Sequence, residues 1–556
     1  VISGKHNSVS ESTNTSSYYT FETFGEYKYT LKDIHNFDAV AGYSLARSTG
    51  YGFSASRQGV PFNSWAYADI SAATGVNSAT NTNASGGSST QNLTRRNLSY
   101  FGRINYDYKD KYLASFSARR DGSIAFGPKN KFANFFAGSV GWVATKEDFF
   151  KVDFIDYLKI RSSYGSIGNE NVSPQYVGVV TGGPSYSTIV NSNGYTFGGV
   201  FIPGSTIGSF VNEVLRWEKQ IQFNAGFDIR VLKNKVSLSA DYFTKAVDGL
   251  LFNDPPSLYA GTSQQVASNI GTTETKGFDL SLGYNTLIGK DFKFNTSVNF
   301  TTSNNMVTAT NTDGTAFYSG GSYFNGVTYN STRFAKGFTP GHFYGFKTDG
   351  LFQNAAEIAA SPTQTNVAPG DIKFVDANGD GKISDLDKVQ IGDPFPDYTI
   401  GWNLGFEFKN FEFTMFTYLS QGNDVYRAYE RNDVYTNKWA GILNRWTGEG
   451  TTNDARYPRH VTDDKNANWR VSDRFIEDGS FVKIKNVMLG YTVPPSLYKN
   501  KLFSKILVYV QVKNLLTITK ASGYDPELGG GIMETGVDRG NYPQARTIAA
   551  GIDIRF

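Results

Sequence analysis

A period-two alternation of apolar and polar residues is the feature of this sequence that most constrains its fold. Residues 547–556 show it most clearly, because apolar side chains occupy every second position: Ile548, Ala550, Ile552, Ile554 and Phe556. The same pattern recurs at 221–231, 292–300 and 506–512. Successive side chains of a strand point to opposite faces, so each segment predicts a strand with one apolar and one polar face.

Composition decides which kinds of β protein fit this pattern. The chain has 556 residues with 34 Tyr and 43 Phe, and its mean hydropathy is −0.36. No run approaches the roughly 20 apolar residues that a membrane helix needs, which excludes a helical membrane protein. A membrane β-barrel stays open as an explanation, because its alternating strands give only a weak hydropathy signal.

The sequence lacks the residues or motifs that several kinds of site require. The chain has no Cys, which argues against a disulfide framework and against thiol metal sites, and its His residues at 6, 35, 342 and 460 have no zinc-type spacing. The net charge of +3 comes without the basic clusters that nucleic-acid binding needs. There is no GxSxG and no phosphate-binding Gly-rich motif, so we expect no catalytic residues and no enzyme.

Short and long connections alternate along the chain. Tight turns are expected at 31–33, 108–111, 233–235, 288–291 and 409–410, and longer turns near 146–156 and 494–505. Long segments rich in Gly, Ser, Asn, Thr or Trp lie at 49–91, 169–217, 249–271, 304–397, 422–473 and 518–544. Outer-membrane barrels show this asymmetry, with short periplasmic turns and long extracellular loops. Counting crossings predicts an all-β, antiparallel transmembrane barrel sheet of about 15 strands in this chain.

The main alternative is a soluble all-β protein, a propeller or a tandem of sandwiches, whose strands also alternate. A propeller requires repeats of about 40 to 50 residues, which the sequence does not show. Strands of this length with strict turn asymmetry favour the membrane barrel.

The direction of the strands adds an expectation about what precedes Val1. The first strand, near 18–30, and the last strand both run toward the side of the short turns. An even-numbered antiparallel barrel that begins and ends this way needs an odd number of strands before Val1. Without an initiator Met or a signal peptide, the chain is expected to be a processed or partial product with two open sheet edges.

An ordered series of short motifs, spread over nearly the whole chain, resembles the C-terminal portion of SusC/RagA-type TonB-dependent outer-membrane transporters. The matching segments are 119–123, 159–165, 168–169, 215–218, 269–271, 276–278, 376–381, 478–487, 489–494, 514–515, 523–527 and 542–546. Each motif is weak by itself, whereas the series in this order is specific.

The resemblance implies a barrel of about 22 strands with an N-terminal plug in its lumen. On this mapping, residues 1–556 are the C-terminal part of the barrel with its long extracellular loops, and about seven strands and the plug lie upstream. The implied location is the outer membrane of a Gram-negative bacterium, in contact with its lipid. The implied partner for energy coupling is TonB-ExbB-ExbD, acting through the missing N-terminal part.

The family's function is import of large nutrients, oligosaccharides or peptides, together with a SusD-like surface lipoprotein that closes over the barrel as a lid. Two alternatives stay open. A passive porin of about 16 strands would close by itself and need no plug. A secretion- or adhesion-linked surface barrel would require partners that the sequence does not name.

Aromatic residues in the segment 422–473 are candidates for contact with a substrate or with the lid. They are Tyr426, Tyr429, Tyr435, Trp439, Trp446 and Trp469. Such rings stack on sugars or pack on a partner surface. The alternative is that they fold the loop or belong to an interfacial aromatic girdle.

The segment 376–387 has the spacing of a calcium-binding loop. The expected ligands are Asp376, Asn378, Asp380, the carbonyl of Lys382, and Asp387 at position 12, with Gly381 at the sharp turn. Asp387 replaces the usual Glu and has a shorter side chain, and no helix pair flanks the loop. We therefore expect Ca²⁺ as a staple of the loop, with an ion-free cluster of Asx turns as the alternative.

Overall fold

The structure of the chain is a computed structural model. It describes all residues except 1–6, 61, 63, 75, 78–81, 84, 128, 172–184, 189–193, 204, 210, 211, 213, 255–265, 270, 311–316, 325, 326, 431–437, 463 and 499–501.

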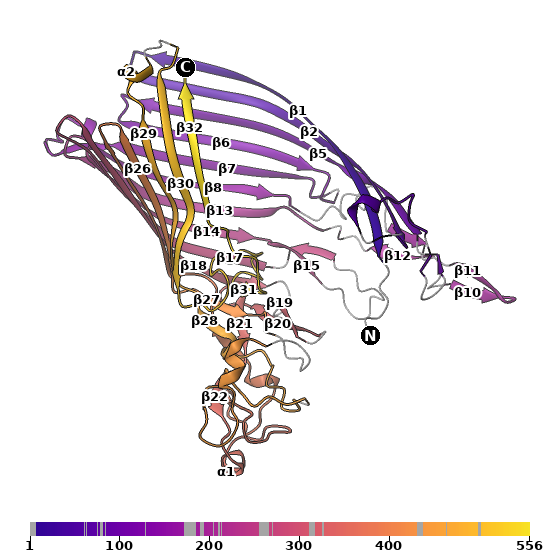
Figure 1. Cartoon of the computed structure of the whole chain (residues 1–556). Helices are drawn as coiled ribbons and strands as arrows, with labels where there is room; N and C mark the ends of the chain where they lie inside the picture. The colour runs from indigo at the N-terminus through magenta and orange to yellow at the C-terminus, as the bar shows by residue number, and fades with distance from the viewer. Residues whose placement is uncertain are drawn as a thin grey trace.

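One antiparallel sheet of 15 strands dominates the molecule, and neighbouring strands follow one another along the chain from one edge to the other. Figure 1 shows it as a strongly curved surface, with the long connections gathered at one end of the strands. The strands are β1 (Ser8–Leu31), β2 (His35–Gln58), β5 (Ser85–Tyr108), β6 (Tyr112–Ser123), β7 (Phe132–Val143), β8 (Ile155–Asn169), β13 (Glu218–Val231), β14 (Val236–Asp248), β17 (Gly271–Ile288), β18 (Phe292–Thr310), β25 (Tyr398–Phe408), β26 (Phe411–Gln421), β29 (Phe481–Thr492), β30 (Lys505–Thr519) and β32 (Thr547–Arg555). The predicted count of strands and their antiparallel order are confirmed.

The two faces of the sheet differ in the way that the alternation predicts. Residues that pair in register across β8, β13, β14, β17, β18, β25, β26, β29 and β30 form one apolar row: Ile160, Phe227, Ala240, Leu280, Phe300, Ile400, Leu419, Val482 and Ile518. The neighbouring row, one residue along each strand and therefore on the other face, contains Arg161, Gly226, Asp241, Asp279, Thr301, Thr399 and Ser420. An apolar outer band around a polar interior is the arrangement of a membrane barrel.

The polar face carries its own ion pairs. Arg161 Nη1 lies 2.6 Å from Asp241 Oδ1, and Arg161 Nε lies 3.0 Å from Asp228 Oδ2. Thr301 Oγ1 donates a hydrogen bond of 2.7 Å to Asp279 Oδ1. These contacts link strands across the face, so the polar row is itself a cross-strand network.

The predicted tight turns are present. The turn between β1 and β2 places Lys32 at φ 54° and Asp33 at φ 56°, and the turn between β5 and β6 places Lys109 at φ 54° and Asp110 at φ 51°. Two successive residues at positive φ give the turn type whose twist matches that of the flanking strands, which explains why connections this short suffice.

The first strands are longer than predicted. β1, β2 and β5 each span 24 residues. The ladder between β2 and β5 continues through Gly52 and Ser54 to Arg57, so the expected connection 49–91 shrinks to 59–84. Backbone pairing continues through segments rich in Gly and Ser, such as 85–90, which a search for apolar alternation misses.

Three long connections pack together at one end of the sheet, and we call them the loop assembly: the described residues of 311–397, 422–480 and 520–546. Its strands are β19 (Phe317–Phe324), β20 (Val327–Phe334), β21 (His342–Gly345), β22 (Thr348–Leu351), β23 (Ile372–Phe374), β24 (Val389–Gly392), β27 (Asp424–Arg427), β28 (Ile476–Asp478) and β31 (Val537–Asp538). β27 pairs with β28 on one side and with β31 on the other. Figure 1 shows the assembly, from β19 to β31, beyond the ends of the sheet strands.

Short elements complete the described residues. Paired strands in other loops are β3 (Val76–Asn77) with β4 (Thr82–Asn83), β9 (Ser185–Thr188) with β12 (Ser205–Ser209), β10 (Gly194–Phe197) with β11 (Val200–Pro203), and β15 (Leu251–Asp254) with β16 (Val266–Asn269). The helical segments are η1 (Trp65–Tyr67), η2 (Ala144–Lys146), α1 (Ala355–Ala359), η5 (Asp385–Asp387), η6 (Ala440–Asn444), η7 (Asp473–Phe475) and α2 (Pro495–Tyr498). Among the described residues, no helix has the length and apolar character that crossing a membrane requires.

Candidate ligand-binding site

A cavity of about 400 Å³ lies within the loop assembly. Its lining residues come from 427–430, 438–442, 456–461, 464–475 and Ser522. β27 ends at Arg427, the first lining residue, and η6 and the coil that follows η6 supply most of the remaining wall. A cavity of this volume falls in the range that small-molecule ligands occupy in proteins.

Aromatic rings form one side of the cavity. The rings of Tyr429 and Trp439 are 5.0 Å apart between centroids, and those of Trp439 and Tyr524 are 6.2 Å apart. Trp439 is 48% exposed, so its indole is available to a ligand. The Tyr429 hydroxyl is 2.9 Å from Ser522 Oγ, which joins the loop 422–480 to the loop 520–546.

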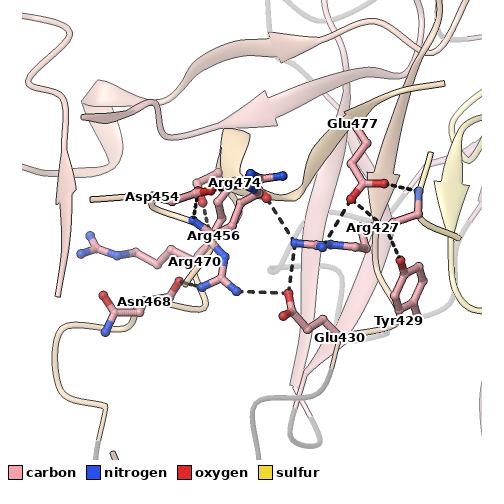
Figure 2. Close-up of polar contacts among 11 residues, drawn as sticks. Arg427, Tyr429, Glu430, Asp454, Arg456, Asn468, Arg470, Arg474 and Glu477 are labelled. Atoms are coloured by element: carbon pink, nitrogen blue, oxygen red, sulfur yellow. Dashed lines mark hydrogen bonds and ion pairs between the residues drawn. The ribbon is translucent and has the colours of Figure 1, made fainter. Parts of the chain in front are cut away.

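A network of ion pairs includes three residues that line the cavity, Arg427, Glu430 and Arg474 (Figure 2). Arg427 Nη1 lies 3.3 Å from Glu477 Oε1, and Arg427 Nη2 lies 3.5 Å from Glu430 Oε2. Arg474 Nη2 lies 3.1 Å from the same Glu430 oxygen. Ser522 donates its backbone N–H and its hydroxyl to Glu477, at 2.7 and 2.8 Å. Each carboxylate therefore holds more than one donor, and the network fixes the positions of both guanidinium groups.

Two further arginines line the cavity, and both are paired. Arg456 Nη2 lies 2.6 Å from Asp454 Oδ2, as Figure 2 also shows. Arg459 Nε lies 2.6 Å from Asp371 Oδ1, and the Asp371 side chain is fully buried. The charge on every arginine that lines the cavity is thus compensated by a carboxylate.

His460 stands exposed at the rim of the cavity. Partial burial and the nearby positive charges of Lys438 and Arg445 lower its pKa below the ordinary value of 6.5. Its imidazole is therefore neutral at pH 7 and offers one donor and one acceptor nitrogen. Burial raises the pKa of Tyr429, so its phenol also stays neutral.

The aromatic residues predicted from the sequence are divided by the structure. Tyr429, Trp439 and Trp469 line the cavity. Tyr426 is completely buried between Phe343 and Phe475, so its ring has no exposed face for a ligand or a lid and instead fills the core of the loop assembly. Trp446 packs against another core cluster and donates Nε1–H to Gln353 Oε1 at 3.3 Å. Tyr435 lies outside the described residues.

The predicted calcium loop is ordered by bonds to its own backbone. Asp376 accepts N–H bonds from Gly379, Asp380 and Gly381, at 2.7, 3.2 and 2.7 Å. Asp387 is fully buried and accepts N–H bonds from Ala377, Asn378 and Ser384, at 2.9, 3.3 and 2.7 Å.

The two remaining side chains make turns of the Asx type. Asn378 Oδ1 accepts from Asp380 N, and Asp380 Oδ1 accepts from Lys382 N, each at 2.9 Å. Within the part of the chain that the structure describes, no three His, Cys, Asp or Glu side chains gather as metal ligands. These bonds form an Asx-turn cluster, and calcium binding stays a prediction.

The sequence pointed to neither the charged network nor the cluster beneath the loop 520–546. In that cluster Lys483 of β29 is 1% exposed and contacts Asp525 and Glu527. Arg427 and Glu477, and likewise Lys483 and Asp525, are separated by tens of residues, so spacing along the chain gives no signal for either pair. The only sequence signal was indirect: the segments 478–487 and 523–527 both belong to the motif series.

Comparison with known proteins identifies relatives of this chain. A family model described as TonB dependent receptor-like, beta-barrel, matches residues 3–411. The chain is 32% identical over 472 residues to TonB-dependent receptor P3 of Formosa agariphila, covering 83% of this chain and 45% of that protein. It is 29% identical over 469 residues to TonB-dependent receptor SusC of Bacteroides thetaiotaomicron, covering 83% and 44%. The chain therefore spans about half the length of the curated relatives it matches.

Among solved structures, the RagAB peptide transporter has a chain that superposes with a TM-score of 0.79 at 23% identity, covering 98% of this chain and 56% of that one. The RagAB peptide importer in its open-open state gives 0.79 at 24% identity. At this identity the likeness concerns the fold.

Proposed function

The chain belongs to the TonB-dependent receptor family, and from this premise we propose that it forms the transport barrel of a SusC-like importer of large nutrients, oligosaccharides or peptides. It is a protein of the Gram-negative outer membrane, as its family is. The proposal extends to the whole protein, in which residues 1–556 are the C-terminal part of a plugged barrel.

One observation carries the proposal: the same sheet has an apolar row on one face, a polar row on the other, and a ligand-sized cavity in the loops at one end. The apolar row matches a lipid-facing wall and the polar row a lumen. A cavity at the loop end lies where a ligand that arrives from outside the cell first meets the protein. A passive channel needs only the lipid-facing wall and the polar lumen, so the cavity supports an importer over a porin.

The proposed partners are those that the resemblance to SusC/RagA-type transporters implies. A SusD-like lipoprotein would close over the loop assembly, and TonB-ExbB-ExbD would supply energy through the plug. Tyr429, Trp439 and Trp469 are the residues of the predicted aromatic set that we propose for contact with substrate or lid, since they line the cavity. Tyr426 and Trp446 are better explained by packing within the loop assembly.

The test is to purify the native protein from outer membranes in mild detergent and to identify every co-migrating chain by mass spectrometry. A SusD-like lipoprotein and a plug-bearing polypeptide are the expected companions. Deleting the gene should also abolish growth on at least one oligosaccharide or peptide source. A stable barrel without either companion, with small-solute conductance and no growth defect, would instead identify a porin.

A further inference from the structure

The cavity in the loop assembly combines three properties that restrict its ligand: arginines that are each paired with a carboxylate, an exposed aromatic wall and, among the described lining residues, the absence of a free strand edge. Arg427, Arg474, Arg456 and Arg459 are each paired with a carboxylate. An anionic ligand would have to compete with Glu430, Glu477 and Asp454 for these cations, and it would be repelled by them. Binding of a carboxylate, sulfate or phosphate group at these paired arginines is therefore unfavourable.

Arg456 still has hydrogen-bonding capacity toward the cavity that it lines. Its side chain is 51% exposed, so N–H groups of the guanidinium are available to a ligand while Asp454 holds the group in place. His460 adds a neutral imidazole with one donor and one acceptor. Donors and acceptors thus lie side by side. Hydroxyl groups, which donate and accept at once, match such a surface better than groups of one kind.

The aromatic wall suits a ring with an apolar face. Trp439 is 48% exposed and is held by Tyr429 and Tyr524, with ring centroids 5.0 and 6.2 Å away. The C–H face of a pyranose packs on such a ring while its hydroxyl groups point outward, and a preorganised indole loses little entropy on binding.

This cavity offers an extended peptide fewer favourable contacts than it offers a sugar. Peptides gain affinity by adding a strand to an exposed sheet edge. Of the described lining residues only Arg427 lies in a strand, and β27 is paired on both sides, with β28 and β31. The described backbone that lines the cavity therefore offers no unpaired strand edge to a peptide.

We propose that this cavity is a subsite for an uncharged glycosyl residue, so that the imported ligand is a neutral oligosaccharide. The proposal rests on the importer function proposed above and narrows its substrate class. Trp439 supplies the stacking surface, and Arg456, held by Asp454, and His460 bind ring hydroxyl groups.

The test uses the native protein with its co-purifying chains, and isothermal titration calorimetry with three kinds of probe: neutral hexasaccharides of glucan, xylan and mannan type, hexagalacturonate, and a mixture of tryptic peptides. At least one neutral hexasaccharide should bind about tenfold more tightly than the other two probes. Trp439→Ala should weaken that binding about tenfold. Trp65→Ala is the matched control, since Trp65 is 95% exposed on a different loop and should change nothing.

A second variant keeps all the aromatic rings. Asp454→Asn leaves Arg456 without its carboxylate, and it should raise the affinity for hexagalacturonate about fivefold, a larger change than the one it causes in neutral binding. Failure of every neutral hexasaccharide to bind, equal effects of Trp439→Ala and Trp65→Ala, or tighter binding of hexagalacturonate to the unaltered protein would each overturn the proposal.

The outcomes also separate this inference from the importer function. Peptide binding that depends on Trp439, together with peptide-dependent growth, would refute the glycosyl subsite and leave the importer intact. Loss of the gene without any change in growth on oligosaccharides or peptides would refute the importer itself.

Discussion

Lys483 Nζ lies 2.6 Å from Asp525 Oδ1, an ion pair that joins strand β29 of the sheet to the loop 520–546. The same ammonium group is 3.0 Å from Glu527 Oε2, and the Lys483 residue is only 1% exposed. Replacing Lys483 by Met keeps the length of the side chain and leaves two carboxylates without this cation. Because Lys485 still pairs with Glu527, we expect opening of the loop to become easier by about 2 to 3 kcal/mol, somewhat less than for a fully broken buried pair.

Hydrogen exchange of peptides from 520–546 measures this opening. Lys520→Met is the control. The Lys520 side chain is 85% exposed, and its ammonium group comes no closer than 3.6 Å to the Asp478 carboxylate. A surface pair of this kind contributes about 0 to 1 kcal/mol. Equal exchange in the two variants would show that the Lys483 cluster does not hold the loop.

Asp371 and Arg459 give a second prediction, within the loop assembly. The buried Asp371 carboxylate accepts bonds from Arg459 Nε and Nη2, Asn468 Nδ2 and Ala368 N, at 2.6, 3.1, 3.0 and 2.8 Å. Asp371→Asn removes the charge and at least one acceptor, so the segments 364–374 and 459–468 should separate more easily, by about 3 kcal/mol. Faster tryptic cleavage in 459–470 would report it.

Asp349→Asn is the matched variant for Asp371→Asn. Asp349 pairs with Lys373 at 2.6 Å, but its side chain is 65% exposed. Its removal should change cleavage of 459–470 little. If both substitutions accelerate cleavage equally, the burial of Asp371 has no special role.

The sequence predicted the sheet much better than the loops, and the reason is physical. Strand residues such as Ile548 and Ile552 obey a local rule, since the period of two follows from the backbone. The loop assembly has no such period: Tyr426 is buried and Trp439 exposed although both are aromatic residues of the same segment. Their difference depends on Phe343 and Phe475, which reach Tyr426 from distant parts of the chain.

His342 makes the packing of the loop assembly sensitive to pH. The residue is fully buried, and Nδ1 is 2.9 Å from the carbonyl of Thr339, whereas no partner of Nε2 is present among the described residues. Burial is the main cause that lowers the pKa of His342, and the positive charge of Arg333 lowers it further. The Thr339 carbonyl and Asp393 raise the pKa, but the net shift is downward. A lowered folded-state pKa means that its stability contribution is complete above about pH 6.5 and is lost as the pH falls through the folded-state value.

The measurement is hydrogen exchange of residues 331–345 at pH 7.5 and 5.5, corrected for the intrinsic exchange rate. Exchange should be faster at pH 5.5, because a protonated Nε2 would be a buried donor without an acceptor. His342→Phe keeps a ring against Phe338 and removes the titration, so its corrected exchange should not depend on pH in this range. Identical pH dependence in both proteins would exclude His342 as the cause.

Calcium removal tests the loop 376–387. If Asp376, Asn378, Asp380, the Lys382 carbonyl and Asp387 hold Ca²⁺ as their spacing predicts, saturating Ca²⁺ should stabilise the loop by about 3 kcal/mol and slow its proteolysis, and EDTA should reverse the effect. Asp376→Asn should remove the response. Asp385→Asn should keep it, because Asp385 is outside the predicted ligand set and its side chain is 84% exposed. Proteolysis that is the same in Ca²⁺ and in EDTA would leave the Asx turns as the whole explanation of the loop.

Leu280 and Ser281 test which face of the sheet meets lipid. Leu280 pairs with Ala240 and Phe300 in the apolar row, whereas Ser281 is on the other face and donates to Asn299 Oδ1 at 2.8 Å. An arginine on the lipid face near the middle of the membrane costs about 2 to 4 kcal/mol, and one in a polar lumen costs far less. We therefore expect Leu280→Arg to lower the amount of folded protein in outer membranes and its urea midpoint, and Ser281→Arg to leave both nearly unchanged. The two positions are adjacent in one strand, so any general intolerance of β17 to arginine would affect both, and only a difference between them supports the assignment of the faces.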